Sequence, residues 1–141
     1  MDRKGSAVWQ GSIREGKGEV STETGTLKSA PYSFTSRFES GAGTNPEELL
    51  AAAHAACFSM AFSGQLASEK LTAERIATTA TVTIEKVDGG FGITHVHLAM
   101  EARVPGADKA AFDRLAGNAK AGCPVSKLFN TKITLDAKLV A

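Results

Sequence analysis

The chain has 141 residues, of which 16 are basic and 15 acidic, so its formal net charge is +1. A chain of this length usually folds as one domain with a hydrophobic core of its own. The near balance of charges excludes a strong field for nucleic acid or an anionic membrane. No apolar segment follows the basic residues near the start, and the most apolar stretch, residues 49–62, is too short to cross a bilayer. We therefore expect a cytoplasmic protein without a signal peptide.

The N-terminal part, residues 5–38, is expected to be rich in β-structure. Apolar and polar residues alternate there, and glycine-containing turns separate the runs. The last run, residues 32–38, alternates aromatic and polar side chains and contains Arg37. This pattern predicts that Arg37 lies in a strand.

A central helix is expected over residues 46–68. Asn45 is a good N-cap, Pro46 suits the first helical position, and Glu48 has the spacing of a capping box. The alanine-rich sequence that follows lacks a polar face, which indicates that the helix is buried against other helices.

The C-terminal half is expected to begin with a β-hairpin over residues 75–104, with its turn at 88–90. An amphipathic helix follows over 107–120. A short helix and a last strand are expected within 124–140. The predicted class is therefore α+β in a single domain.

Cys57 and Cys123 are the residues best suited to covalent chemistry. Only a thiolate is a nucleophile, and apolar surroundings raise the pKa of a thiol, so Cys57 within its apolar helix needs a cation nearby. Cys123 precedes a short helix whose free N–H groups favour a thiolate. From these residues alone, an inert core cysteine and a redox-active pair both stay open.

Arg37 is the best candidate for that cation. A partly buried guanidinium needs a carboxylate partner, and Glu47 is the candidate, although it is equally explained as a charge at a helix N-terminus. Glu47 and Cys57 are ten residues apart on one helix, which is roughly 15 Å. An arginine that serves both therefore indicates that one of them comes from the helix of a second subunit.

The histidines offer an alternative chemistry. His54 lies one turn before Cys57 and could act as its general base or share a metal ion with it. His95 and His97 alternate on one strand and could add two ligands. Since no Cys-x-x-Cys or His-Glu-x-x-His spacing is present, the metal signal is weak.

Two motifs resemble a known family. Residues 44–50 and 53–60, which surround Cys57, and residues 123–126, which begin at Cys123, resemble the OsmC branch of the OsmC/Ohr family of organic hydroperoxide reductases. The segment 37–39 and the hairpin turn are also similar to that branch. The resemblance covers nearly the whole chain.

The family resemblance implies an α+β fold built as an intertwined homodimer, with long central helices packed between antiparallel β-sheets. It implies that Cys57 is the peroxidatic thiol, that Cys123 is the resolving thiol, and that Arg37 forms a salt bridge with Glu47 at the subunit interface. The Ohr branch places its arginine earlier in the chain, where Arg14 is the alternative.

The resemblance also implies an activity. The implied activity is that of a thiol-dependent peroxidase, which reduces organic hydroperoxides to alcohols and protects against oxidative and osmotic stress. The intermediates would be a Cys57 sulfenic acid and a Cys57–Cys123 disulfide. The reductant would be a dithiol, generally of the lipoyl type, and no metal or organic cofactor would be needed. Two hypotheses without catalysis stay open: a binder of apolar small molecules, and a structural stress protein with a passive disulfide.

Overall fold

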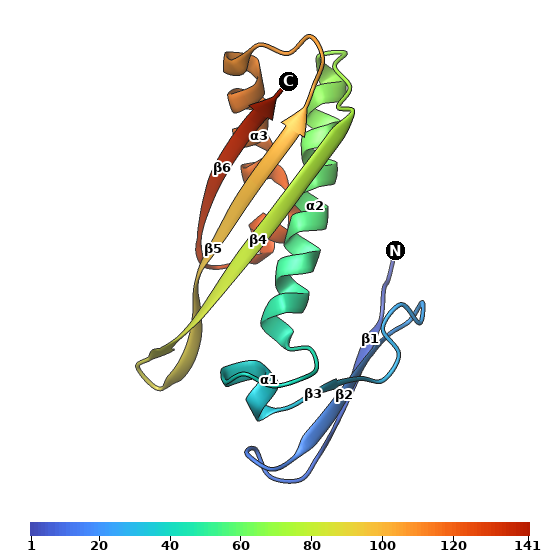
Figure 1. Cartoon of the computed structure of the whole chain (residues 1–141), viewed down its shortest axis with the longest axis vertical. Helices are drawn as coiled ribbons and strands as arrows, with labels where there is room; N and C mark the ends of the chain where they lie inside the picture. The colour runs from blue at the N-terminus through green and yellow to red at the C-terminus, as the bar shows by residue number, and fades with distance from the viewer. The chain divides into compact units, whose positions relative to one another are not determined.

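The computed structural model describes residues Met1–Ala141 (Figure 1). The chain forms two compact units, Met1–Leu49 and Leu50–Ala141. The strands are β1 Gly5–Gln10, β2 Lys17–Thr22, β3 Ala30–Tyr32, β4 Arg75–Val87, β5 Gly90–Arg103 and β6 Lys132–Val140. The helices are α1 Phe34–Phe38, α2 Pro46–Ser68, α3 Lys109–Gly122 and α4 Pro124–Leu128.

The first unit contains an antiparallel sheet with the strand order β1-β2-β3. Trp9 on β1 and Tyr32 on β3 bring their ring centroids to 5.5 Å across the middle strand. Gly18 on β2 pairs with both residues, and a Cβ atom there would lie 2.4 Å from the Tyr32 ring. Glycine is therefore required for the two rings to approach. The predicted β-structure is present as far as Tyr32.

The sequence pattern predicted that residues 34–38 continue the β-structure. This prediction is wrong, because these residues form helix α1. Ser33 caps this helix: its Oγ accepts a hydrogen bond from the Ser36 N–H, and Ser36 Oγ accepts one from the Ser33 N–H. The rings of Phe34 and Phe38, four residues apart, pack at a tilt of 51° with centroids 5.0 Å apart. The alternating aromatics therefore pair along one helical turn, and Arg37 lies on a helix.

Helix α2 spans the residues expected from its start signals. Asn45 Oδ1 accepts a hydrogen bond from the Glu48 N–H at 2.8 Å, which satisfies one free donor of the first turn. The Glu48 carboxylate does not return to the cap backbone as in a capping box. It accepts a hydrogen bond from Thr44 Oγ1 at 2.6 Å instead.

The second unit contains a sheet with the order β4-β5-β6. The predicted hairpin is present, with Asp88 and Gly89 between the paired residues Val87 and Gly90. Strand β6 runs parallel to β5, so this sheet is mixed and not antiparallel as expected. The reason is the connection between the two strands. Helices α3 and α4 return the chain to the end of the sheet where β5 begins, and a parallel neighbour must start there.

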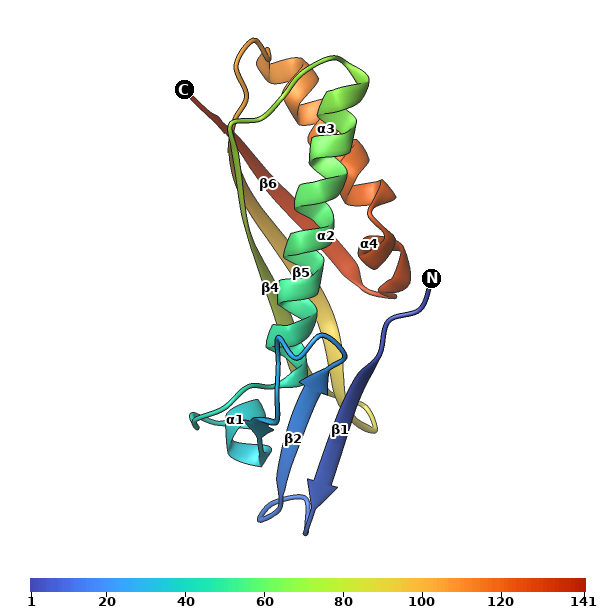
Figure 2. The same cartoon turned by 90° about the vertical axis from the view of Figure 1, so that its right-hand side faces the viewer.

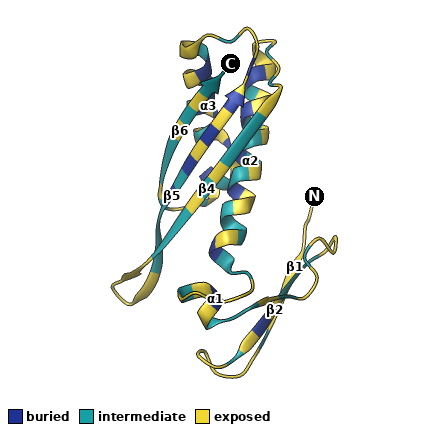
Figure 3. Ribbon diagram, in the orientation of Figure 1, coloured by how far each residue is buried: buried dark blue, intermediate teal, exposed yellow.

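Helices α2 and α3 cover one face of this sheet (Figures 1 and 2). Every second residue of β5 from Val96 to Ala102 is buried, while the intervening residues are more exposed (Figure 3). The core contains aromatic and aliphatic side chains from both helices and β5, among them Phe58, Phe62, Leu66, Leu98, Met100, Phe112 and Leu115. This core fixes the part of α2 that carries Cys57.

Helix α3 begins two residues later than predicted and ends two residues later. Asp108 is its N-cap and accepts a hydrogen bond from the Ala111 N–H at 2.7 Å, so Ala107 lies outside the helix. At the other end Cys123 is both the C-cap of α3 and the residue before Pro124, which opens α4.

One face of α2 is exposed. Its residues are small or apolar: Ala52, Ala53, Ala56, Met60, Ser63, Gly64 and Ala67. We call these residues the α2 face, and at its centre Met60 is 79% exposed. With 23 residues and a mean hydropathy of 1.3, α2 is long and apolar enough to cross a membrane, which corrects the expectation that no segment is. One such helix is weak support for a span, because core helices of soluble proteins have the same properties.

Candidate active site

The two cysteines, far apart in sequence, are in contact within the second unit. Cys57 lies in the middle of α2, Cys123 lies between α3 and α4, and their Sγ atoms are 2.9 Å apart. Both are free thiols, Cys123 fully buried and Cys57 partly exposed. Because a disulfide needs an S–S distance of about 2.05 Å, a small shift of the side chains would join them. The structure thus brings together the two cysteines that the motifs singled out.

The end of α3 fixes the position of Cys123. Its N–H donates to the Ala119 carbonyl at 2.9 Å and closes the last turn of α3. Pro124 then occupies the first position of α4, where its missing N–H has no cost. The backbone turns at this point, so the N–H groups of Val125 and Ser126 are directed at Cys123 Sγ.

The two thiols have opposite tendencies to ionise. Burial raises the pKa of the Cys57 thiol, and its hydrogen bond with Cys123 raises that pKa further. Burial also acts to raise the pKa of Cys123, but the bond with Cys57 and those from Ser126 and Val125 outweigh it and lower that pKa. Within this unit Cys123 therefore ionises more readily than Cys57. A reactive Cys57 needs a positive charge from elsewhere, as the sequence indicated.

His54 is fully buried one turn before Cys57, but it does not face that thiol as a base would. Its Nε2 lies 2.7 Å from Ser126 Oγ, and its ring packs edge-on against Phe129 with centroids 5.2 Å apart. Its Nδ1 is buried without a hydrogen-bond partner. Burial lowers the pKa of His54. Ser126 lies in the second cysteine motif, but no role for it was predicted; its place three residues after Cys123, in the first turn of a helix, was the available signal.

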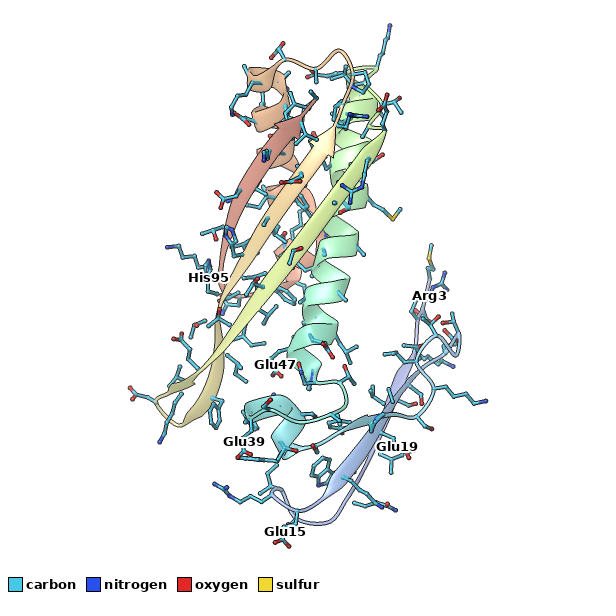
Figure 4. All side chains as sticks on the ribbon, viewed as in Figure 1. Arg3, Glu15, Glu19, Glu39, Glu47 and His95 are labelled. Atoms are coloured by element: carbon cyan, nitrogen blue, oxygen red, sulfur yellow. The ribbon has the colours of Figure 1, made fainter.

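Arg37 and Glu47 form a close ion pair within the first unit. The guanidinium makes three contacts with the carboxylate: Nε to Oε1 at 3.1 Å, Nε to Oε2 at 3.3 Å and Nη2 to Oε1 at 2.8 Å. Glu47, at the start of α2 (Figure 4), is buried, whereas the Arg37 side chain is 38% exposed. Arg14 instead stacks its guanidinium on the Phe34 ring, 4.9 Å from the centroid. The arginine paired with Glu47 is thus Arg37.

The other two histidines lie on the far side of the second sheet from the helices. His95, labelled in Figure 4, and His97 occupy the less buried positions of β5, and both approach Thr134 Oγ1, at 2.8 and 2.6 Å. His97 Nε2 also lies 3.2 Å from Asp136 Oδ2. No three His, Cys, Asp or Glu side chains form a group that could hold a metal ion. These histidines therefore do not join Cys57 and His54 in a shared site.

An apolar pocket of about 200 Å³ adjoins the segment after α4. Its lining residues are Leu50, Val82, Ile93, Leu128, Phe129, Asn130 and Thr131. Phe129 is also the ring that packs on His54, so the pocket and the buried histidine share one wall.

Comparison with known proteins places this arrangement in a family. A model of the family described as "OsmC-like protein" matches residues 39–138. The chain is 54% identical over 139 residues to "Peroxiredoxin OsmC" of Escherichia coli strain K12, covering 99% of this chain and 97% of the relative. It is 40% identical over 87 residues to "Organic hydroperoxide resistance protein" of Xanthomonas axonopodis pv. citri, covering 61% of this chain and 59% of the relative.

A solved structure has the same fold. The OsmC-like protein VCA0330 of Vibrio cholerae matches with a TM-score of 0.76 at 16% identity, over 97% of this chain and 99% of the other. The chain belongs to the OsmC-like family, which confirms the prediction made from the two cysteine motifs. The α+β class and the family fold are confirmed with it.

Proposed function

We propose that this chain reduces organic hydroperoxides to alcohols, with Cys57 as the attacking thiol and Cys123 as the resolving thiol. It is a thiol-dependent peroxidase by family, since a relative matching 99% of the chain is named a peroxiredoxin and one matching 61% of it is named for organic hydroperoxide resistance. The observation that carries the residue assignment is the 2.9 Å separation of the two Sγ atoms, which come from the two family motifs. The predicted organisation as one domain over residues 1–141 is part of this proposal.

The reaction takes place in three steps. The Cys57 thiolate attacks the distal oxygen of the hydroperoxide, the O–O bond breaks, and the alkoxide leaves and takes up a proton to become the alcohol. Cys57 is thereby oxidised to the sulfenic acid. Cys123 then attacks the Cys57 sulfur, the S–O bond breaks, and the hydroxyl leaves with a proton as water. An external dithiol finally reduces the Cys57–Cys123 disulfide by exchange and becomes a disulfide itself.

Arg37 would supply the positive charge that Cys57 lacks. A guanidinium beside Cys57 would favour its thiolate and stabilise the charge on the leaving alkoxide. The paired contacts with the buried Glu47 would hold that guanidinium in one orientation. Since Glu47 and Cys57 are ten residues apart on α2, we propose that the arginine acts across a subunit interface.

A homodimer would complete this site and cover the α2 face. That face is apolar or small along its length and carries no charged residue, which suits close packing against a second helix. It also suits the family arrangement in which two central helices pack together. We therefore propose a second copy of this chain, and not lipid, as its partner.

The reductant is proposed to be a lipoyl-type dithiol and the location cytoplasmic. A cycle that ends in a disulfide needs a reducing compartment to restart it. The apolar surroundings of Cys57, with Phe58 and the core behind it, favour an alkyl hydroperoxide over hydrogen peroxide.

Turnover of cumene hydroperoxide with dihydrolipoamide as electron donor tests the proposed function. Cys57→Ser is the control, and hydrogen peroxide is the comparison substrate. We expect rapid consumption of the organic peroxide, slower consumption of hydrogen peroxide, and loss of both in the variant. No turnover with any dithiol would contradict the proposal and favour a binder of apolar molecules; full activity of Cys57→Ser would contradict the assigned nucleophile.

A further inference from the structure

Ser126 contacts the resolving cysteine, and His54 contacts Ser126. Neither residue takes part in the three steps of the proposed reaction. Ser126 is 9% exposed and His54 is fully buried, so both polar groups are almost out of contact with water. Buried polar groups are costly unless they are hydrogen-bonded, and a pair of them beside a reactive sulfur calls for an explanation.

The unpartnered Nδ1 determines which nitrogen of His54 carries the proton. A neutral imidazole has one N–H, and placing it on Nδ1 would bury a donor with no acceptor. On Nε2 the same proton is donated to Ser126 Oγ at 2.7 Å. Burial, with no charged group contributing, lowers the pKa of His54 and keeps the ring neutral.

Accepting from His54 leaves Ser126 with its own hydroxyl proton to donate. The side chain of Ser126 and its backbone N–H both hydrogen-bond with Cys123, and both bonds lower the pKa of its thiol. A hydrogen bond donated to a sulfur stabilises the thiolate more than the thiol. Three groups are therefore aligned in order, His54 donating to Ser126 and Ser126 donating to Cys123.

We propose that His54 is a positioning residue for the resolving step, which holds Ser126 so that its hydroxyl donates to Cys123 Sγ while this cysteine attacks the Cys57 sulfenic acid. The resolving role rests on the proposed function, but the hydrogen-bond relay does not. In this arrangement Cys123 attacks as an anion, and the hydroxide that leaves Cys57 takes its proton from solvent on the exposed side of the pair.

The test measures the thiolate directly, without a peroxide. In a Cys57→Ala background Cys123 is the remaining thiol, and its ionisation is followed by the ultraviolet absorbance of the thiolate against pH. Ser126→Ala is expected to raise the pKa of Cys123 by about one unit or more, since a hydrogen bond to a charged group is lost. Ser126→Thr, which keeps a hydroxyl, is expected to titrate close to the background protein.

Two isosteres test His54 in the same background. His54→Gln can place an amide N–H near the position of Nε2 and should leave the pKa of Cys123 as it is in the background protein. His54→Asn places its amide near Nδ1, loses the contact with Ser126, and should raise that pKa. Thermal unfolding of each variant checks that the fold is retained. Equal titration of Ser126→Ala and the background would overturn the donor role of Ser126, and equal titration of the Gln and Asn variants would overturn the role of His54.

A single-turnover experiment with Cys57 present separates this inference from the peroxidase itself. After one equivalent of cumene hydroperoxide, Ser126→Ala should still form the Cys57 sulfenic acid, and disulfide formation should move to higher pH. An unchanged pH profile of disulfide formation would contradict the inference. If no sulfenic acid forms in the unmodified protein, the proposed function fails, while the titration result stands independently.

Discussion

Cys57 and Cys123 differ in what surrounds their sulfur atoms, although the two atoms are 2.9 Å apart. Cys123 receives hydrogen bonds from Val125 and Ser126 that lower its pKa, whereas burial and the bond with Cys123 raise the pKa of Cys57 despite a bond from Val125. Attack on a peroxide by Cys57 therefore depends on a cation outside this pair. At the scale of single residues, Arg37 is the group on which the account depends most.

Arg37→Lys is expected to slow the formation of the Cys57 sulfenic acid by roughly a hundredfold. Lysine keeps the charge, but it cannot make the paired Nε and Nη contacts that Arg37 makes with Glu47. The rate is measured by rapid mixing with cumene hydroperoxide. Arg14→Lys is the matched control, because Arg14 stacks on Phe34 in the same unit, and its rate should stay near that of the unmodified chain. A larger loss in Arg14→Lys would make Arg14 the activating residue.

The sequence identified the two cysteines and the Arg37–Glu47 pair but not Ser126. Spacing along the chain carries no information on distance, so the contact between Cys57 and Cys123 followed from the family motifs and not from the residues. In the sequence, a serine two residues after Pro124 cannot be told apart from any other small residue in a helix. The role proposed for Ser126 follows only from the folded structure, where His54 lies within hydrogen-bond distance of its hydroxyl.

At the scale of elements, the prediction was accurate where local signals decide the structure and wrong where they do not. Asn45 and Pro46 define the start of α2 by their own chemistry, and the hairpin turn defines the β4–β5 pair. Residues 34–38 alternate like a strand, yet the Ser33 cap makes them a helix. The parallel direction of β6 depends on where the α3–α4 crossover delivers the chain, which no local pattern encodes.

Helix α2 presents an uncharged face that is expected to pack against a second copy. Met60→Glu places a charge at its centre, where burial of an unpaired carboxylate is costly, and should weaken self-association about a hundredfold or more. Asn118→Glu, at an exposed position of α3, is the matched control and should associate normally. Sedimentation equilibrium measures both. Unchanged association of Met60→Glu, or a monomeric unmodified chain, would contradict the proposed dimer.

At the scale of the whole molecule, the ion pair of Arg37 and Glu47 and the thiols of Cys57 and Cys123 belong to different compact units. Each unit holds half of the proposed chemistry in place: a paired guanidinium in one, two thiols in contact in the other. We propose that the two halves meet in the assembled enzyme, where the positive charge of Arg37 would favour the thiolate of Cys57.

The assignment of Cys57 as the attacking thiol is best tested by finding which cysteine is oxidised to the sulfenic acid. Cys123→Ser and Cys57→Ser are each treated with one equivalent of cumene hydroperoxide in the presence of dimedone, and the adducts are located by mass spectrometry. We expect rapid trapping of a sulfenic acid at Cys57 in Cys123→Ser and no rapid adduct at Cys123 in Cys57→Ser. Rapid trapping at Cys123 in Cys57→Ser, with little at Cys57 in the other variant, would reverse the two roles and contradict the account.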